Sequence, residues 1–242
     1  MRIKHILLFF ISLFFGVGVS SAQKKNEKVA DTLPRIEKYG LRVGVDLAKP
    51  FRTLVENGYS GFEIMGDFRV TKKFYAALEL GTEKKDWIEP YVSSKTSGSY
   101  AKIGFDYNAY ENWLGMRNSI NLGFRYGLSS FSQELLSYRI YTDNPAFPSE
   151  VVTTPVEFND LTAHWAEFIF GVKTELVSNL YLGINLQLKR KIAETQPDNF
   201  GNLYIPGFNR TYDYSEFGVG YGYSVSYLIP IFKKKSAPEV AE

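Results

Sequence analysis

Charged residues recur at every second position along several stretches of this sequence, and they are the side chains with which it could do chemistry. In "LYLGINLQLKRK" (residues 180–191), apolar residues alternate with polar ones that end in Lys189 and Lys191. The charged residues that follow such an alternation are Arg42, Asp46, Glu63, Asp67, Arg69, Glu79, Lys102, Asp106, Arg125, Glu167, Lys173, Glu175 and Lys189, together with Glu83 and Lys191. Cations and carboxylates in this set nearly balance. Because confined charges must be paired or hydrated, a shared location predicts a network of ion pairs.

Catalytic chemistry has few residues to draw on. Once an N-terminal signal peptide is removed, His164 is the one histidine left in the sequence, with Asp143, Glu150 and Asp160 near it along the chain. An acid–base role for His164 at the rim of the fold is one interpretation. A position at the membrane interface or the rim, without a chemical role, is the interpretation that we favour.

The carboxylates do not form a recognisable catalytic pair or metal site. Glu79 and Glu83 share a strand face, as two glycosidase carboxylates could, but in a crowded interior ion pairs are the better interpretation. The sequence has no cysteine, and "TDNP" and "QPDN" are ordinary turn sequences rather than calcium-binding loops. We therefore expect no catalytic residue, no metal and no cofactor.

An alternation with period two predicts β-strands, because successive side chains of a strand point to opposite faces. The stretches with this pattern are residues 39–49, 61–70, 74–83, 101–108, 120–129, 165–176, 180–191 and 217–229. Their lengths match the roughly 9 to 11 residues with which a tilted strand crosses a bilayer. No helical period and no second domain are visible. The sequence thus predicts an all-β, antiparallel fold of eight strands.

The glycines indicate which face is inside. Most strand glycines share the face of the charges, and Gly66 is the clear exception. On a face open to water, as in a lipocalin-like barrel, glycine would only weaken the strand. Inside an eight-stranded barrel, space is short and glycine makes room for long neighbours. We therefore expect charges inside, apolar residues toward lipid, and a transmembrane β-barrel.

The connections between the predicted strands alternate in length. Short connections fall at 71–73, 111–117 and 178–179, and long ones at 49–60, 85–98, 130–160 and 192–212. Short turns on the periplasmic side and long extracellular loops are typical of outer-membrane barrels. The loop at 130–160 carries tyrosines and prolines, from which we expect strand extensions and a contact site for a partner protein.

Aromatic residues near the predicted strand ends are candidates for two interfacial girdles. They are Phe74, Tyr110, Trp113 and Tyr181 on the short-turn side, and Trp87, Tyr91, Tyr138, Trp165 and Tyr212 on the long-loop side. Tyrosine and tryptophan favour the boundary between lipid and water, because one end of the ring system is apolar and the other polar. These residues therefore predict the two edges of a membrane-spanning belt.

The N-terminus reads as a secretory signal peptide. Arg2 and Lys4 precede an apolar run from residue 6 to 19 and a small-residue cleavage site at 20–22. The run is shorter than the roughly 20 residues of a spanning helix. We expect a cleaved signal at 1–22, a flexible periplasmic leader at 23–37, a barrel at 38–232 and a periplasmic tail at 233–242.

The charge of the exported chain limits its partners. Removal of Arg2 and Lys4 lowers the 28 Lys plus Arg by two, so that they equal the 26 Asp plus Glu. A formally neutral chain lacks the basic field that a nucleic-acid partner requires. The expected surroundings are outer-membrane lipid and an outer-membrane protein partner.

Three stretches, "YGLRVGVDLAKPFR", "GFEIMGDFRVTKKFYAALELG" and "SYLIPIFKKK", resemble a Bacteroidetes-type family of uncharacterised outer-membrane β-barrel proteins. The resemblance runs over about residues 39 to 235 and implies fold and location but no activity. The apolar and aromatic run from Tyr227 to Phe232 looks like the signal read by barrel-assembly machinery, although the lysines after Phe232 depart from barrels that end at the aromatic residue.

The predicted function is that of a non-enzymatic, compact barrel with a lumen closed by charges. Its role would be structural or interactive, for example as an accessory subunit of a larger outer-membrane complex such as the barrel-assembly machinery. Two alternatives remain open at this point, namely an enzyme acting on lipid or peptide at the rim and a pore for small solutes.

Overall fold

The computed structural model describes residues 35–110, 118–140, 142 and 149–236, with side chains between residues 38 and 232. The predicted signal peptide, most of the leader and the end of the tail lie outside these residues. Contacts divide the chain into two units, residues 37–234 on the one hand and residues 1–36 with 235–242 on the other. The first unit contains all the described side chains.

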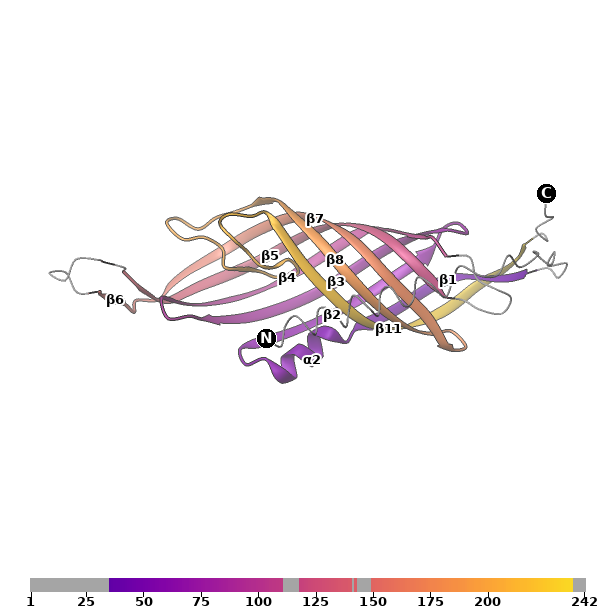
Figure 1. The fold of residues 1–242 in the computed structure, drawn as a ribbon, viewed down its shortest axis with the longest axis horizontal. Helices are drawn as coiled ribbons and strands as arrows, with labels where there is room; N and C mark the ends of the chain where they lie inside the picture. The colour runs from indigo at the N-terminus through magenta and orange to yellow at the C-terminus, as the bar shows by residue number, and fades with distance from the viewer. Residues whose placement is uncertain (1–34, 111–117, 141, 143–148, 237–242) are drawn as a thin grey trace, which may run out of the picture. The chain divides into compact units, whose positions relative to one another are not determined.

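Eight long strands dominate the described part of the chain. They are β1 (Arg35–Asp46), β2 (Tyr59–Arg69), β3 (Phe74–Ile88), β4 (Val92–Asn108), β5 (Ser119–Arg139), β7 (Val156–Val177), β8 (Leu180–Glu194) and β11 (Phe217–Ser236). The short elements are α2 (Ala48–Val55), β6 (Val151–Val152), β9 (Tyr204–Ile205) and β10 (Asn209–Arg210). The long strands close into an antiparallel ring, because β4 pairs with β5 and β11 lies beside β1 (Figure 1). The predicted all-β, antiparallel fold with eight principal strands is confirmed at this level.

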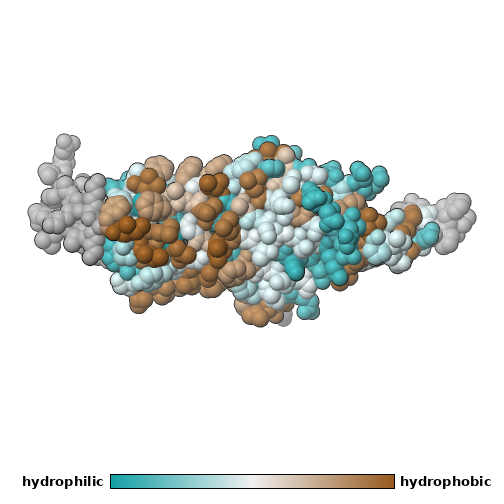
Figure 2. All heavy atoms as spheres, turned by 180° about the vertical axis from the view of Figure 1, so that it is seen from behind, coloured by the Kyte–Doolittle hydropathy of each residue, from teal (hydrophilic) through white to brown (hydrophobic). Residues whose placement is uncertain are grey.

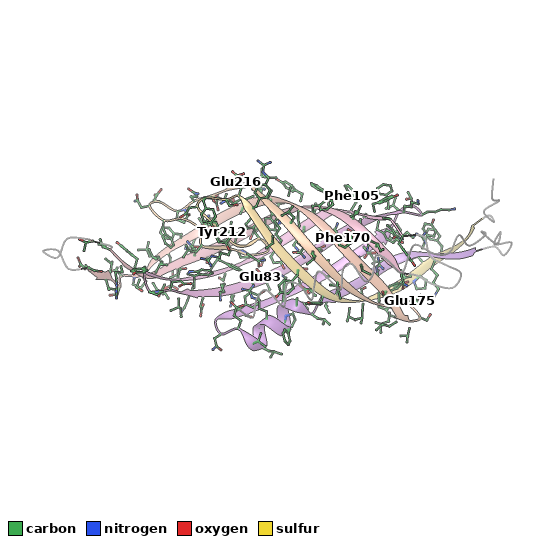
Figure 3. All side chains as sticks on the ribbon, in the orientation of Figure 1. Glu83, Phe105, Phe170, Glu175, Tyr212 and Glu216 are labelled. Atoms are coloured by element: carbon green, nitrogen blue, oxygen red, sulfur yellow. The ribbon has the colours of Figure 1, made fainter. Side chains whose placement is uncertain are left out.

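The alternation in the sequence becomes the two faces of this ring. Outward residues are apolar and exposed, such as Ile103 at 63% and Leu186 at 62%, whereas the inward Lys102 is only 1% exposed. Figure 3 shows Phe105 and Phe170 on the outside of the ring. In Figure 2 the brown, apolar residues gather over the part of the ring nearer the short turns, and the other part is largely teal and white. The ring is thus inverted relative to a water-soluble barrel, with polar groups inside.

We call the end of the ring opposite the turns at 70–73 and 178–179 the long-loop end. At this end four strands extend beyond the apolar part of the outer face. Strands β3, β4, β5 and β7 have 15, 17, 21 and 22 residues, against 12 and 11 for β1 and β2. The expected long loop at 85–98 is therefore wrong, because most of it is paired strand. Both faces of β3 are polar from Thr82 to Asp86, so the hydropathic alternation disappears there although the backbone pairing continues.

The expected loop at 49–60 contains the helix α2. Asp46 accepts a hydrogen bond from the backbone N–H of Ala48, and Pro50 occupies the first turn, where its missing N–H costs nothing. Lys49 and Arg52 lie on the face toward the ring, whereas Leu54 is 84% exposed. Eight residues are too few for a helical period to stand out in the sequence.

The described part of the chain contains no helix with the length and apolar character needed to cross a membrane.

The prediction of an interfacial position is wrong for two aromatic residues. Trp165 is fully buried inside the ring, and Tyr181 is 4% exposed beneath the guanidinium of Arg42. Both occupy inward positions of their strands, and the indole of Trp165 fills the space that Gly127 leaves on the paired strand. Of the other predicted members, Phe74, Tyr91, Tyr138 and Tyr212 are exposed, Trp87 and Tyr110 are half-buried, and Trp113 lies outside the described residues.

A methyl group at position 127 tests the packing inside the ring. The Cβ of Gly127→Ala would overlap the ring of Trp165, so we expect the free energy of unfolding to fall by about 1–3 kcal/mol. Gly66→Ala is the matched control, because its Cβ would point outward and meet only the carbonyl oxygen of Arg42 at 3.8 Å. Urea unfolding of both variants in detergent measures the difference. Equal effects of the two substitutions would contradict this packing.

Candidate functional site

The interior of the ring, which we call the lumen, contains a chain of ion pairs that starts near the short turns. Arg42 donates from Nε to both carboxylate oxygens of Asp67, at 3.0 and 2.9 Å. Lys173 bridges Asp67 and Asp106, with Nζ to oxygen distances of 2.9 and 3.4 Å. Arg125 then joins Asp106 at 2.7 Å to Glu79 at 3.0 Å. These contacts connect β1, β2, β3, β4, β5 and β7 across the lumen.

Lys102 is the central cation of the lumen. Its Nζ lies 2.9 Å from Glu79, 3.2 Å from Glu63 and 3.8 Å from Glu167. Its side chain and that of Glu167 are almost completely buried. One ammonium group therefore holds carboxylates of three different strands, and it depends on all of them for its charge.

Glu167 connects a side branch to the network. Lys189 lies 3.9 Å from its carboxylate and donates to the carbonyl oxygen of Gly207 at 2.7 Å. The indole N–H of Trp165 donates to Glu167 at 3.1 Å. This branch couples the charges to the segment 203–210, which enters the ring from the long-loop end.

Glu83 lies inside the ring, where the Lys49 side chain of α2 and groups of the segment 203–210 both reach it. Lys49 of α2 forms an ion pair with it at 2.5 Å. The hydroxyls of Tyr59 and Tyr204 donate to its two oxygens at 3.1 and 2.7 Å, and the backbone N–H of Gly207 donates at 3.0 Å. Figure 3 places Glu83 within the ring. Two segments that the sequence predicts as extracellular loops are thus anchored to one buried carboxylate.

An apolar cluster closes the long-loop end of the lumen. Ile205 and Phe208 pack against inward residues of the strands, among them Trp165. The full cluster comprises Tyr100, Phe131, Leu161, Ala163, Trp165, Ile205 and Phe208. The expectation that 192–212 forms an external loop is therefore wrong for its central part, because Tyr204, Ile205 and Phe208 are at most 2% exposed.

Most of the charged residues singled out from the sequence belong to one connected network. Its members are Arg42, Lys49, Lys102, Arg125, Lys173 and Lys189 with Glu63, Asp67, Glu79, Glu83, Asp106 and Glu167. Cations and carboxylates are equal in number in this network. Balanced, mutually paired charges favour a filled interior over a reactive one, because each proton donor is engaged with an acceptor.

The remaining predicted residues make other contacts. Asp46 accepts hydrogen bonds from the backbone N–H groups of Ala48 and Tyr223, and so fixes the start of α2. Arg69 lies over the ring of Tyr39 near the short turns. Two predicted residues make local contacts near strand ends, Glu175 with the backbone N–H of Asn179 and Lys191 with the side chain of Glu194.

The polar face of α2 continues the electrostatic pattern outside the ring. Glu56 accepts from both Arg52 and Lys85. The hydrogen bond from Arg52 is the main reason why the pKa of Glu56 falls to about 2. The carboxylate therefore stays ionised at any physiological pH and holds two cations at the mouth of the ring.

His164 lies on the outer face of β7. Its Nδ1 is 3.3 Å from the hydroxyl of Tyr126 on the neighbouring strand. No group of three or more acidic or histidine side chains suited to a metal ion occurs within the described residues. Glu150 is exposed near the extension, and Asp143 lies outside the described part.

Comparison of the sequence with models of protein families identifies the family of this chain. The profile of a family described as a domain of unknown function, DUF6048, matches residues 4–234. The chain belongs to the DUF6048 family. No curated protein matches the chain. The ring, the network and the segment at its mouth all fall within the stretch that defines DUF6048.

Sequence reasoning missed several members of the site in this DUF6048 chain. Tyr59 lies two residues before Gly61, and Tyr100 lies two residues before Lys102, both on the charged face. A prediction of longer strands would therefore have included both tyrosines. Lys49 and Tyr204 reach the lumen from a helix and a folded-back segment. No local pattern identifies such contacts, because they depend on how distant segments meet.

Removal of the central cation tests the network. Lys102→Met leaves Glu63, Glu79 and Glu167 without their shared partner, so we expect a loss of about 3–5 kcal/mol in the free energy of unfolding. Lys95→Met on the same strand is the control, because Lys95 is exposed, and its effect should stay within about 0.5 kcal/mol. Denaturant titration in detergent compares them, and two similar losses would refute the network's role.

Proposed function

We propose that this chain is a compact, eight-stranded β-barrel of the outer membrane that acts as a non-enzymatic structural or interaction protein. The signal peptide at 1–22 would direct its export, and the short turns would face the periplasm. The observation that carries the proposal is the pairing of an ion-paired lumen with an apolar outer face. Such an inverted ring is stable where lipid surrounds it and no water needs to pass through it.

The outer face supports a location in a bilayer. Apolar side chains stay exposed on every long strand, for example Val43 on β1 and Val219 on β11. A closed ring leaves few backbone groups unpaired, which is the requirement for strands in hydrocarbon. In water, a continuous apolar surface of this kind would drive aggregation.

The filled lumen supports a closed barrel rather than a pore for small solutes. Ion pairs occupy its middle, and the cluster around Trp165 and Phe208 fills the long-loop end. A conducting lumen would need a continuous water path with fixed charges along it. The position of His164 on the outer face also favours a non-enzymatic role over acid–base chemistry at the rim.

The strand extensions support an interaction role. Their tips carry exposed apolar side chains, which are Ile88, Tyr91, Tyr138, Ile140, Val151 and Val156. Backbone hydrogen bonds join the tips, from the N–H of Arg139 to the carbonyl oxygen of Tyr91 and from the N–H of Ile140 to that of Glu150. Tyr138 and Ile140 share one face of the extension, whereas Val151 pairs with Arg139 and lies on the other face. An exposed apolar patch away from lipid typically marks a protein contact. We therefore propose that these tips bind a partner, as an accessory subunit of a larger outer-membrane complex such as the barrel-assembly machinery.

Cell fractionation tests the location. The chain should separate with outer-membrane markers on a density gradient and should remain in the membrane after carbonate washing, because its apolar surface needs lipid. Its unheated form should migrate differently from the boiled form on a gel, as folded barrels do. Recovery in the soluble fraction would contradict the proposal.

Co-purification tests the partner. Tyr138→Asn with Ile140→Asn should abolish recovery of the partner complex from native membranes, because both remove apolar area from the patch. Thr162→Asn, exposed lower on β7, is the control and should leave recovery unchanged. A barrel that is recovered alone in every case, or a partner that stays bound to the double variant, would contradict the interaction role.

A further inference from the structure

The wall of the ring is incomplete at the long-loop end between β2 and β11. Strand β1 stops at Asp46, and its last backbone contact with β11 is from the N–H of Leu47 to Tyr223. Beyond this point β2 continues over residues 59–63, paired with β3, and β11 over residues 217–222, paired with β8. The helix α2 follows β1 at this point and lies along β2, at one side of the gap (Figure 1).

A cavity of about 950 Å³ opens at this gap. Its inner lining is polar and includes Lys49 and Lys189 of the ion-pair network. Its outer edge includes Leu186, Val219 and Tyr221, which are 62%, 74% and 61% exposed on the outside of the ring. The cavity thus joins the polar interior to the apolar outer surface, as a site for a molecule with a polar head and an apolar tail requires.

Glycines on β11 make room for side chains at and near this cavity. Gly218, Gly220 and Gly222 occupy the inward positions of β11 beside the gap. A Cβ on Gly220 would meet the side chains of Gln187 and Lys189. A larger residue at position 220 would displace these two side chains of the cavity lining.

Cations and carboxylates both line the cavity, the carboxylates being Asp46, Glu56, Asp86 and Glu89, and Arg210 is the cation of this lining that we consider for an anionic ligand. Its guanidinium lies over the rings of Trp87 and Tyr212, at 4.8 and 5.1 Å from their centroids. These cation–π contacts hold the guanidinium at the cavity, and its N–H donors remain able to bind a ligand. Among the described residues no carboxylate forms an ion pair with Arg210, whereas Arg52 and Lys85 both pair with Glu56.

We infer that this gap is a binding site for one anionic phospholipid, whose phosphate pairs with Arg210 and whose acyl chains follow Leu186, Val219 and Tyr221. Arginine matches phosphate better than lysine does, because its planar donors can contact two oxygens at once. The inference rests on the proposed function, since such a lipid is present only around a membrane-embedded ring. It adds a lateral site in the wall to a barrel whose lumen is closed.

Native mass spectrometry of the detergent-purified full chain tests the site, with phosphatidylglycerol, phosphatidylcholine and inorganic phosphate as probes. The wild type should retain one phosphatidylglycerol and bind phosphatidylcholine more weakly. Arg210→Gln should reduce phosphatidylglycerol affinity roughly tenfold, because one charge-assisted hydrogen bond contributes about that much. Val219→Gln should also weaken binding through the tail. The matched control is Arg190→Gln, since Arg190 also lies over an aromatic ring but pairs with Glu216 outside the cavity, and it should match the wild type.

Three results would overturn the inference: equal retention by the Arg210 and Arg190 variants, equal binding of the two lipids, or displacement of the lipid by inorganic phosphate at the same concentration. The last result would identify a site for free phosphate. Unheated gel migration verifies that each variant is folded. A folded, membrane-embedded chain that gives any of these results contradicts this site alone, whereas a chain found in the soluble fraction contradicts the proposed location.

Discussion

The ion pairs around Lys102 are the constraint on which the rest of the structure depends. A buried ammonium group costs several kcal/mol to remove from water, and only carboxylates at short range repay that cost. Lys102 obtains them from three strands, and each of those carboxylates needs a further cation such as Arg125 or Lys189. The same need for paired charges extends along the lumen to Glu83, whose contacts also hold α2 and the segment 203–210 in place. A polar interior in turn leaves the apolar side chains on the outside.

Much of this fold can be predicted from the sequence, because the alternation of apolar and polar residues is a local pattern. A period of two identifies the strands, and the shared position of glycines and charges places Lys102 and Glu79 on one face, where they lie. The pattern fails where both faces become polar, as in β3 beyond Thr82. It fails again for Trp165, whose type suggested a membrane boundary although its inward position in β7 agreed with burial beside Gly127.

The contents of the lumen were less accessible to sequence reasoning. Alternation assigns a side chain to a face, but the partner of each charge depends on the register and curvature of the closed ring. The pairing of Lys173 with Asp67, for example, crosses from β7 to β2. Lys49 lies in a helix at the end of a predicted strand and Tyr204 in a segment without strand pattern, and both donate to Glu83. Loops that satisfy buried charges therefore become part of the interior.

The central claim is that these charges close the lumen and that the chain works through its outer surfaces. Recording from the purified chain in a planar lipid bilayer tests it most directly. A barrel filled by paired charges and by the cluster around Phe208 should insert without discrete conductance steps at any applied voltage that the bilayer tolerates. Reproducible single-channel steps from the wild type would show a continuous water path through the ring and would contradict the account.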